Sequence, residues 1–263
     1  MAKFFPIVSS SEGNATYIGS SSTGVLVDAG ASYKKLKNAL EKVGITVDKV
    51  KAVVITHHHN DHIKGLRVFL KNNPVPVIAS RETIYALEYQ KIINGDTPRI
   101  YIDEIDSYSV GDILIKRYPT SHDCLGSSCY RLEIGEEIKT AVCTDLGIMT
   151  DCVFEALTGC DLVMLESNHD PVMLRLGPYP PELKLRIGSD EGHLPNAVCA
   201  QTISKLYETG TTRFVLAHLS ETNNTPEKAA SSVRAALMDK GAVENVDYML
   251  YVAEKEDNRV ILL

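Results

Sequence analysis

Residues 56–62 read Thr-His-His-His-Asn-Asp-His, a run with four histidines and an aspartate within seven residues. It overlaps the end of segment 52–56, whose β-branched residues predict a strand. It runs directly into segment 63–72, whose apolar spacing predicts a helix. A chain with this run must therefore place several metal-binding side chains in one sharp strand-to-helix connection.

The spacing within the run suits two metal ions. Alternate residues at the end of a strand point the same way, so His57 and His59 can bind one ion. The turn into the helix can direct Asp61 and His62 toward a second ion, while His58 faces away. A surface histidine cluster is the alternative interpretation of such a run.

Three further candidate ligands lie outside the run. His122, Asp145 and His218 each lie shortly after the end of a segment that is predicted to be a strand. Loops at sheet ends are where rigid scaffolds carry binding side chains. Three such residues argue against a fortuitous histidine cluster, so the sequence predicts a metal site.

The rest of the chain predicts a mixed α/β fold. Predicted strands cover 25–28, 52–56, 75–79, 113–118, 128–134, 138–143, 162–165, 213–217 and 248–252, and predicted helices cover 32–44, 63–72, 82–93, 196–207 and 225–238. Two mixed α/β halves in succession favour two sheets face to face with helices outside. No low-complexity linker divides the 263 residues, so we expect a single domain over 1–263.

Charge and composition narrow the class of protein. A net charge of -7 argues against a protein that coats nucleic acid, but not against a nuclease, because bound cations can attract a phosphate locally. No apolar stretch is long enough for a signal peptide or a membrane span, so we expect a cytoplasmic protein without a membrane partner. The six cysteines show no CxxC pair, and we expect reduced thiols.

The order of these residues resembles the metallo-β-lactamase superfamily, whose pattern is an early Asp, then HxHxDH, His, Asp and His. The resemblance covers essentially the whole chain and implies the α/β fold of that superfamily, a four-layer αββα sandwich. It also implies one metal on His57, His59 and His122, a second on Asp61, His62 and His218, Asp145 as the bridging ligand, and Asp28 as the residue that orients the cluster.

The donor set favours phosphodiester hydrolysis. Histidine and aspartate with a bridging carboxylate suit a close pair of Zn²⁺ or Mn²⁺ ions. Asp145 stands where the zinc β-lactamases often have Cys, which disfavours hydrolysis of antibiotics. A close metal pair lowers the pKa of a bridging water, giving a hydroxide that can attack phosphorus in line. The sequence therefore favours a phosphodiesterase.

A candidate acid for the leaving group comes from Glu166 and His193. The pair resembles that of the transfer-RNA 3′ processing enzymes, in which a strand-end glutamate orients a histidine that precedes a helix. Charge on Glu166 would raise the pKa of His193 and keep it able to donate a proton. Together with Asp61 these are the candidate catalytic residues. The alternative is a structural histidine and a hydrogen-bonded glutamate.

A closer resemblance is to the YycJ/WalJ family, regarded as 5′-to-3′ exonucleases acting on DNA. The segments 9–14, 165–170, 179–187 and 217–226 carry it. It implies single-stranded DNA or duplex ends as substrate, with RNA as an alternative. The chain departs from the family at Pro195, where Ser is usual, which changes the helix cap beside His193.

Four polar residues are candidates for substrate contact. Lys184 and Arg186 can pair with phosphates, and Asn223 and Asn224 lie in a segment that matches the family. For each of the four, a solvated or structural role is the alternative. The turn at 9–14 favours a structural role.

Two other classes of function stay open. A glyoxalase II-like thioesterase or a cyclic-nucleotide phosphodiesterase would use the same metals, but would need a closed pocket where a nuclease needs an open groove. A non-enzymatic regulatory protein that binds metal is the second class. The completeness of the ligand set argues against it.

Overall fold

The computed structural model describes residues 1–135, 137–256 and 258–263. These residues divide into two compact units. The first consists of Met1–Arg117, Cys124–Ile138 and Glu254–Leu263, and the second consists of Tyr118–Asp123 and Lys139–Ala253. Whether they act as the single domain expected over 1–263 stays a prediction.

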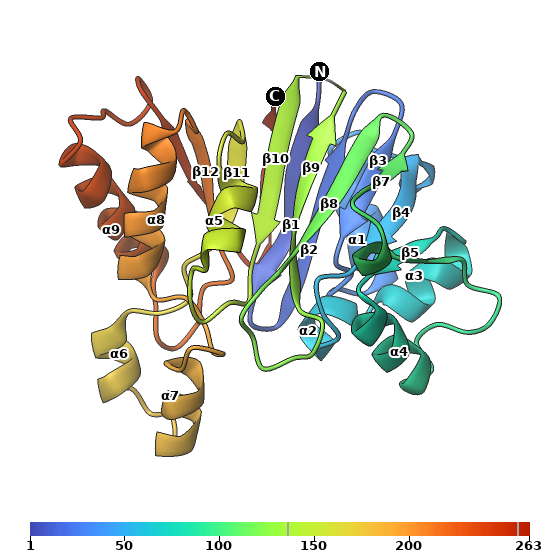
Figure 1. Ribbon diagram of the computed structural model, residues 1–263, viewed down its shortest axis with the longest axis horizontal. Coiled ribbons are helices and arrows are strands. Elements are labelled where there is room, and N and C mark those ends of the chain that lie inside the picture. The colour runs from blue at the N-terminus through green and yellow to red at the C-terminus, as the bar shows by residue number, and fades with distance from the viewer. Residues whose placement is uncertain (136, 257) are drawn as a thin grey trace. The chain divides into compact units, whose positions relative to one another are not determined.

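The first unit contains a sheet with the strand order β14-β1-β2-β3-β4-β5-β6 (Figure 1). Its strands are β1 (Lys3–Ser10), β2 (Gly13–Gly19), β3 (Gly24–Val27), β4 (Val50–Val54), β5 (Val77–Ala79), β6 (Arg99–Tyr101) and β14 (Ile261–Leu262). The pairs from β1 to β3 are antiparallel, and those from β3 to β6 are parallel. Because parallel strands end at the same edge, the residues that follow β3 and β4 lie together.

The hairpin of β1 and β2 is not predicted from the sequence. Pro6 lies inside β1, and a proline in a segment argues against a central strand because it cannot donate to the ladder. The strand accommodates Pro6 by a shift of register between Pro6 and Val8. The turn expected at 9–14 is present, since Ser10 pairs with Gly13.

Helices of the first unit bury their apolar faces against this sheet. They are α1 (Tyr33–Lys42), α2 (Asn60–Ile63), α3 (Leu66–Asn72) and α4 (Arg81–Tyr89), with short 3₁₀ turns η1 (Val47–Lys49) and η2 (Ile102–Glu104). Leu36 and Phe69 belong to one core cluster with sheet residues and have no exposed surface. The helix predicted over 63–72 is divided at Gly65, where a Cβ atom would lie 1.7 Å from the carbonyl oxygen of Ala31. The unit also contains β7 (Tyr108–Val110), most of β8 (Ile113–Pro119) and β9 (Ser128–Ile134).

The second unit contains parallel strands in the order β13-β12-β11-β10. They are β10 (Ile138–Cys143), β11 (Leu162–Glu166), β12 (Arg213–Ala217) and β13 (Met249–Val252), and the helices are α5 (Asp151–Leu157), α6 (Pro171–Leu176), α7 (Pro181–Ile187), α8 (Asn196–Glu208) and α9 (Pro226–Met238). Every residue of β11 is buried, as expected for a parallel strand covered on both faces. Helices α8 and α9 pack side by side (Figure 1).

The prediction of a mixed α/β fold with two sheets is confirmed. Each expected strand and each expected helix is present, whereas β6, β7, β14, α5, α6 and α7 are not predicted from the sequence. No helix of the described residues has the length and apolar character that crossing a membrane requires. None of the six cysteines, all of which the structure describes, forms a disulfide, and reduced thiols stay a prediction.

Candidate metal centre

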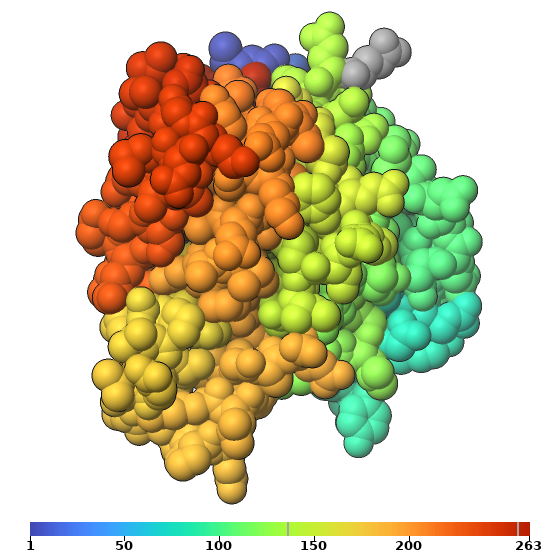
Figure 2. Space-filling model, turned by 60° about the vertical axis from the view of Figure 1, so that its left-hand side comes forward, coloured from blue at the N-terminus to red at the C-terminus, as the bar shows by residue number. Residues whose placement is uncertain are grey.

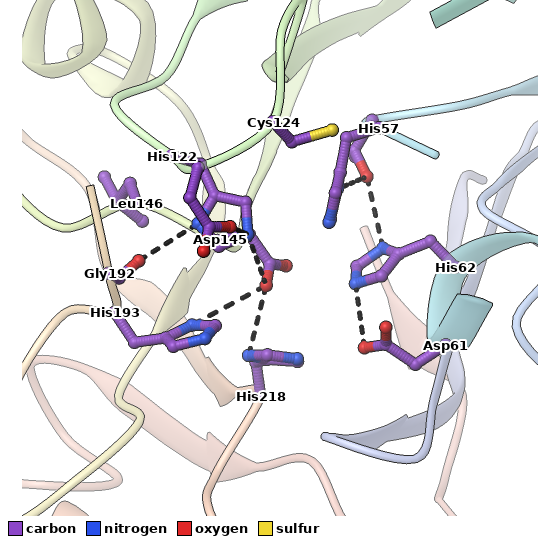
Figure 3. Close-up of polar contacts among 12 residues, drawn as sticks. His57, Asp61, His62, His122, Cys124, Asp145, Leu146, Gly192, His193 and His218 are labelled. Atoms are coloured by element: carbon purple, nitrogen blue, oxygen red, sulfur yellow. Dashed lines mark hydrogen bonds and ion pairs between the residues drawn. The ribbon is translucent and has the colours of Figure 1, made fainter. Parts of the chain in front are cut away.

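Three imidazoles of the first unit cluster between β4 and α2. The ring centroid of His57 lies 4.6 Å from that of His59 and 4.2 Å from that of His62. His57 and His62 have no exposed surface. Asp61 joins the cluster, with Oδ2 3.2 Å from Nε2 of His62 (Figure 3). The unit thus brings together the four residues of the run that were predicted to bind metal.

Asp28 determines the orientation of His62. Its carboxylate accepts hydrogen bonds from the Thr56 N–H at 2.8 Å, the Thr56 hydroxyl at 2.8 Å and Nδ1 of His62 at 2.7 Å. Burial raises the pKa of Asp28, while the contacts with His62 and Thr56 favour its ionised form. Because Nδ1 of His62 carries the proton, Nε2 presents the lone pair that a metal needs. These contacts are the ones that a residue orienting His62 would make, as expected for Asp28.

Thr56 fixes the tautomer of His57 in the same way. The hydroxyl proton of Thr56 goes to Asp28, so its oxygen is an acceptor for Nδ1 of His57, at 3.1 Å. His57 therefore also presents Nε2. Asp28 has a φ of 61°, a conformation that residues other than glycine rarely adopt. Such backbone strain is typical of functional sites.

The β1–β2 hairpin supports the cluster through Asn14 and Gly30. The amide of Asn14 donates to the carbonyl of Ser10 at 2.9 Å and to Oδ2 of Asp61 at 3.2 Å. The N–H of Gly30 donates to the carbonyl of Asn14 at 2.8 Å. A Cβ atom on Gly30 would lie 1.7 Å from the carbonyl oxygen of Asp61. Glycine is therefore required at position 30 for the hairpin and α2 to approach so closely.

The second unit brings together Asp145, Glu166, His193 and His218, whose ligand atoms all lie within 4.8 Å of one another. Asp145, Glu166 and His218 follow or end the parallel strands β10, β11 and β12, which places them at one sheet edge. Nδ1 atoms of His193 and His218 lie 3.6 and 3.5 Å from Oδ1 of Asp145 (Figure 3). Asp145 and His218 have φ values of 60° and 54°, the same strained conformation as Asp28.

The carboxylate of Glu166 is the centre of this second cluster. Its Oε1 accepts from Nδ1 of His193 at 2.8 Å and from Nδ1 of His218 at 2.7 Å. Its Oε2 accepts from the N–H groups of Leu146 and Leu194, each at 3.1 Å. Burial raises the pKa of Glu166, but the two histidines outweigh it and lower the pKa to about 2. The sequence pairs Glu166 with His193 alone, whereas the structure adds His218.

His193 is the most exposed member of the cluster, with 17% of its side chain accessible. Its N–H donates to the carbonyl of Ile187 at 2.9 Å, which holds the loop between α7 and α8 in place. Burial lowers the pKa of His193, but the negative charge of Glu166 outweighs it and raises the pKa above the ordinary value. The expected pairing of His193 with Glu166 is present, and the pKa of His193 is raised, as expected.

The backbone beside His193 is held without a side-chain cap. Pro195 precedes α8 and offers no side-chain acceptor. Instead, the N–H of Asn196 donates to the carbonyl of His169 at 2.9 Å, and the N–H of Leu194 donates to Glu166. The departure from the family pattern at Pro195 therefore leaves the backbone around His193 hydrogen-bonded.

His122 belongs to the same unit and has a defined tautomer. Its Nδ1 lies 3.0 Å from the carbonyl oxygen of Gly192 (Figure 3). A carbonyl only accepts, so Nδ1 carries the proton and Nε2 presents a lone pair. This Nε2 lies 3.9 Å from Oδ1 of Asp145. The second unit thus groups His122 with Asp145.

The donors of both units fit divalent ions of intermediate hardness. His57, His62, His122 and His218 each have Nδ1 bound by an acceptor of the protein, which leaves Nε2 for a metal. Ligand histidines in metalloproteins almost always have such a partner. Imidazole and carboxylate donors suit Zn²⁺ or Mn²⁺. The chemistry of the residues therefore agrees with a metal centre.

The lysine and arginine proposed to contact substrate lie on α7. Figure 2 shows α6 and α7, in yellow to light orange, below α8 and α9. The ammonium of Lys184 donates to the carbonyl of Arg175 at 2.8 Å, and Arg186 pairs with Asp123. The side chain of Arg186 is half exposed. A DNA contact by Lys184 or Arg186 stays a prediction.

The two asparagines that follow β12 are buried, with 0% exposure for Asn223 and 4% for Asn224. The amide of Asn224 donates to the carbonyls of Ser167 and Asn168 at 2.8 and 3.0 Å. It also exchanges hydrogen bonds with the amide of Asn196. These contacts join three loops and favour the structural role for Asn224.

A thiol beside the histidine run is not anticipated by the sequence. Sγ of Cys124 lies 3.1 Å from Nδ1 of His58, the histidine that was expected to face away from the metals. Burial lowers the pKa of His58. Thr56 is also missed as a functional residue. Its hydroxyl is not a typical metal ligand, but its position directly before His57 indicates that it can contact the histidine cluster.

Comparisons with known proteins identify the family of this chain. Residues 23–219 match the model of a family described as the beta-lactamase superfamily domain. The chain is 36% identical over 239 residues to Exodeoxyribonuclease YycJ of Bacillus anthracis, covering 90% of each chain. It is 32% identical over 251 residues to Exodeoxyribonuclease WalJ of Streptococcus pneumoniae strain D39, covering 95% of this chain and 93% of that one.

A solved structure supports the fold. The metallo-β-lactamase fold protein YhfI from Bacillus subtilis superposes over 100% of both chains with a TM-score of 0.73 at 14% identity. The fold implied by the order of the ligand residues is therefore confirmed. The chain is a hydrolase of the beta-lactamase superfamily and belongs to the same family as the YycJ and WalJ exodeoxyribonucleases.

Proposed function

We propose that this protein is a two-metal-dependent phosphodiesterase that degrades DNA from its 5′ end. The observation that carries the proposal is the buried Glu166 carboxylate, which binds the candidate acid His193 and the candidate ligand His218 through one oxygen. This contact couples a proton donor to the donors of a metal centre. The names of the relatives in Bacillus anthracis and Streptococcus pneumoniae supply the substrate class.

The metal assignment rests on the family resemblance and on the tautomers described above. We assign one ion to His57, His59 and His122, a second to Asp61, His62 and His218, and the bridging position to Asp145. Bound there, Zn²⁺ or Mn²⁺ would activate water as a nucleophile at neutral pH and offset the charge of the phosphate. Asp28 keeps His62 in the tautomer that binds metal.

The residues of the second unit supply the proton. Water attacks phosphorus, the bond to the 3′ oxygen of the terminal nucleotide breaks, and the phosphate stays on the shortened strand. His193 donates the proton from Nε2 to the departing 3′ oxygen, because Glu166 holds Nδ1 and leaves Nε2 toward the substrate. General acid catalysis of this kind contributes about 10²- to 10⁴-fold.

The test uses DNA labelled at either end. Purified protein is incubated with Mn²⁺ or Zn²⁺ and 5′- or 3′-labelled single-stranded and duplex DNA, beside Asp145→Ala, His193→Ala and the surface control Lys51→Gln. An RNA strand of the same sequence measures the alternative substrate. Metal content of each protein is measured by mass spectrometry.

The wild type and Lys51→Gln should release the 5′ label first as a mononucleotide. Asp145→Ala should lose metal and activity, whereas His193→Ala should keep its metal and cleave about 10²- to 10⁴-fold more slowly. Release of the 3′ label first would refute the polarity. Equal cleavage by all four proteins would refute the nuclease site. A cytoplasmic location stays a prediction.

A further inference from the structure

A pocket of about 240 Å³ in the first unit is lined by three lysines. Lys35, Lys64 and Lys255 surround it, and Ser10, Gly13 and Gly30 are also part of its wall. We call it the basic pocket. Its cationic lining contrasts with the net charge of -7 for the whole chain.

The positive charge of the basic pocket is only partly neutralised. Glu12 contributes the one carboxylate among the described lining residues, and its Oε2 lies 2.6 Å from the ammonium of Lys255. Lys64 donates to the backbone carbonyl of Glu12. Because a carbonyl group is neutral, this contact does not cancel the charge of Lys64. Lys35 pairs with Glu256, which lies outside the lining, at 2.8 Å. An excess of cationic donors therefore faces the pocket.

Hydrogen-bond donors and open space complete the pocket. The buried Ser10 hydroxyl accepts from the N–H of Glu12 at 3.1 Å, so its own proton can be donated to an anion. A Cβ atom on Gly13 would lie 3.6 Å from Nζ of Lys64 and 2.5 Å from the carbonyl oxygen of Gly30. Glycine at position 13 therefore leaves the space beside the ammonium open.

The basic pocket adjoins the histidine cluster of the same unit. Gly13 directly precedes Asn14, whose amide donates to Asp61. Lys64 follows His62 by two residues at the end of α2. The same hairpin and helix thus contribute residues to the pocket and hold Asp61.

We propose that the basic pocket binds a phosphate of the nucleic acid other than the one being cleaved. This proposal rests on the proposed function. Lysine ammonium groups contact phosphates as point charges without reading sequence. A phosphate held here would position the strand relative to the cluster around His62. The phosphate is either the 5′-terminal monoester or an internal diester of the strand.

Binding without cleavage tests the pocket. Fluorescence anisotropy of 3′-labelled single-stranded DNA, with either a 5′ phosphate or a 5′ hydroxyl, is measured in EDTA over a range of salt concentrations. The proteins are the wild type, Lys64→Gln, Glu12→Gln and Lys51→Gln. Lys51 is an exposed residue of β4 outside the pocket, so its variant makes the same change of net charge elsewhere in the unit. Cleavage of the same strands with Mn²⁺ is measured in parallel.

Lys64→Gln should raise the Kd about threefold to tenfold and reduce the slope of log K against log salt by about 0.7, the loss of one single-strand phosphate contact. Glu12→Gln should lower the Kd, and Lys51→Gln should change neither value. A loss confined to 5′-phosphorylated DNA identifies the terminal phosphate, and an equal loss on both strands identifies an internal diester.

Cleavage by the wild type together with equal Kd values for Lys64→Gln and Lys51→Gln would overturn the pocket alone. Absence of both binding and cleavage in the wild type would overturn the proposed function as well.

Discussion

Replacement of Glu166 by Gln tests the link between the acid and the metal ligand. A glutamine has one acceptor where Glu166 has two. If its oxygen accepts the N–H groups of Leu146 and Leu194, its amide faces Nδ1 of His193 and His218, which are donors themselves. If the amide is reversed, its donors face two backbone N–H groups. In both orientations, two of the four hydrogen bonds are lost.

The size of the effect follows from these contacts. Hydrogen bonds to a charged group contribute about 1.5–3 kcal/mol each, so the two bonds to the histidines represent about 3–6 kcal/mol of orienting energy. Part of this is regained when the imidazoles change tautomer, but Nε2 of His218 then carries a proton and cannot bind metal. Loss of a residue that orients a ligand typically lowers metal affinity about 10- to 100-fold. We therefore expect a loss of this size in Glu166→Gln.

The assay compares Glu166→Gln with His193→Ala. Zn²⁺ affinity is measured by competition with a chromogenic chelator, and cleavage is measured on labelled DNA. Glu166→Gln should lose both metal affinity and activity, while His193→Ala should lose activity alone. If Glu166→Gln bound Zn²⁺ as tightly as the wild type, Glu166 would serve only His193, and the shared role would be refuted.

Two predictions concern stability. Gly30→Ala should lower the free energy of unfolding in urea by about 3 kcal/mol, because the added Cβ would collide with the carbonyl of Asp61. Gly95→Ala should be nearly neutral, because no atom lies within 4 Å of its added Cβ. Equal losses in the two variants would contradict this prediction. Burial lowers the pKa of His169 from 6.5 to about 4. The unfolded chain therefore binds the proton first, so stability is lost as pH falls from 6.5 toward 4, by about 3 kcal/mol. His169→Gln should lack this part of the pH dependence, and identical profiles would disprove the assignment.

The ligand residues could be recognised from the sequence because their signals are local. The run 56–62 stands between a β-branched segment and a helical one, and Asp145 and His218 lie within two residues of the ends of apolar strands. A period of two or of 3.6 residues is visible in a single stretch of chain. Strand ends could therefore be located, and with them the side chains that follow.

Elements with weak local signals could not be predicted. Pro6 makes the segment of β1 look unlike a strand. The short helices α6 and α7 begin at prolines and have no long apolar period. Pro6 fits only because the register of β1 against β2 shifts beside it. That shift depends on how β1 pairs with β2, which cannot be read from the sequence of either strand alone.

The order of residues is sufficient to identify which side chains are available for metal and proton chemistry, and near which strand ends they lie. The orientation of each side chain depends on folding: Asp28 accepts from His62, Gly192 accepts from His122, and Glu166 accepts from two histidines. Folding is needed because the tautomer of a histidine depends on the partner of its Nδ1 atom. Those partners lie 27 to 70 residues away along the chain.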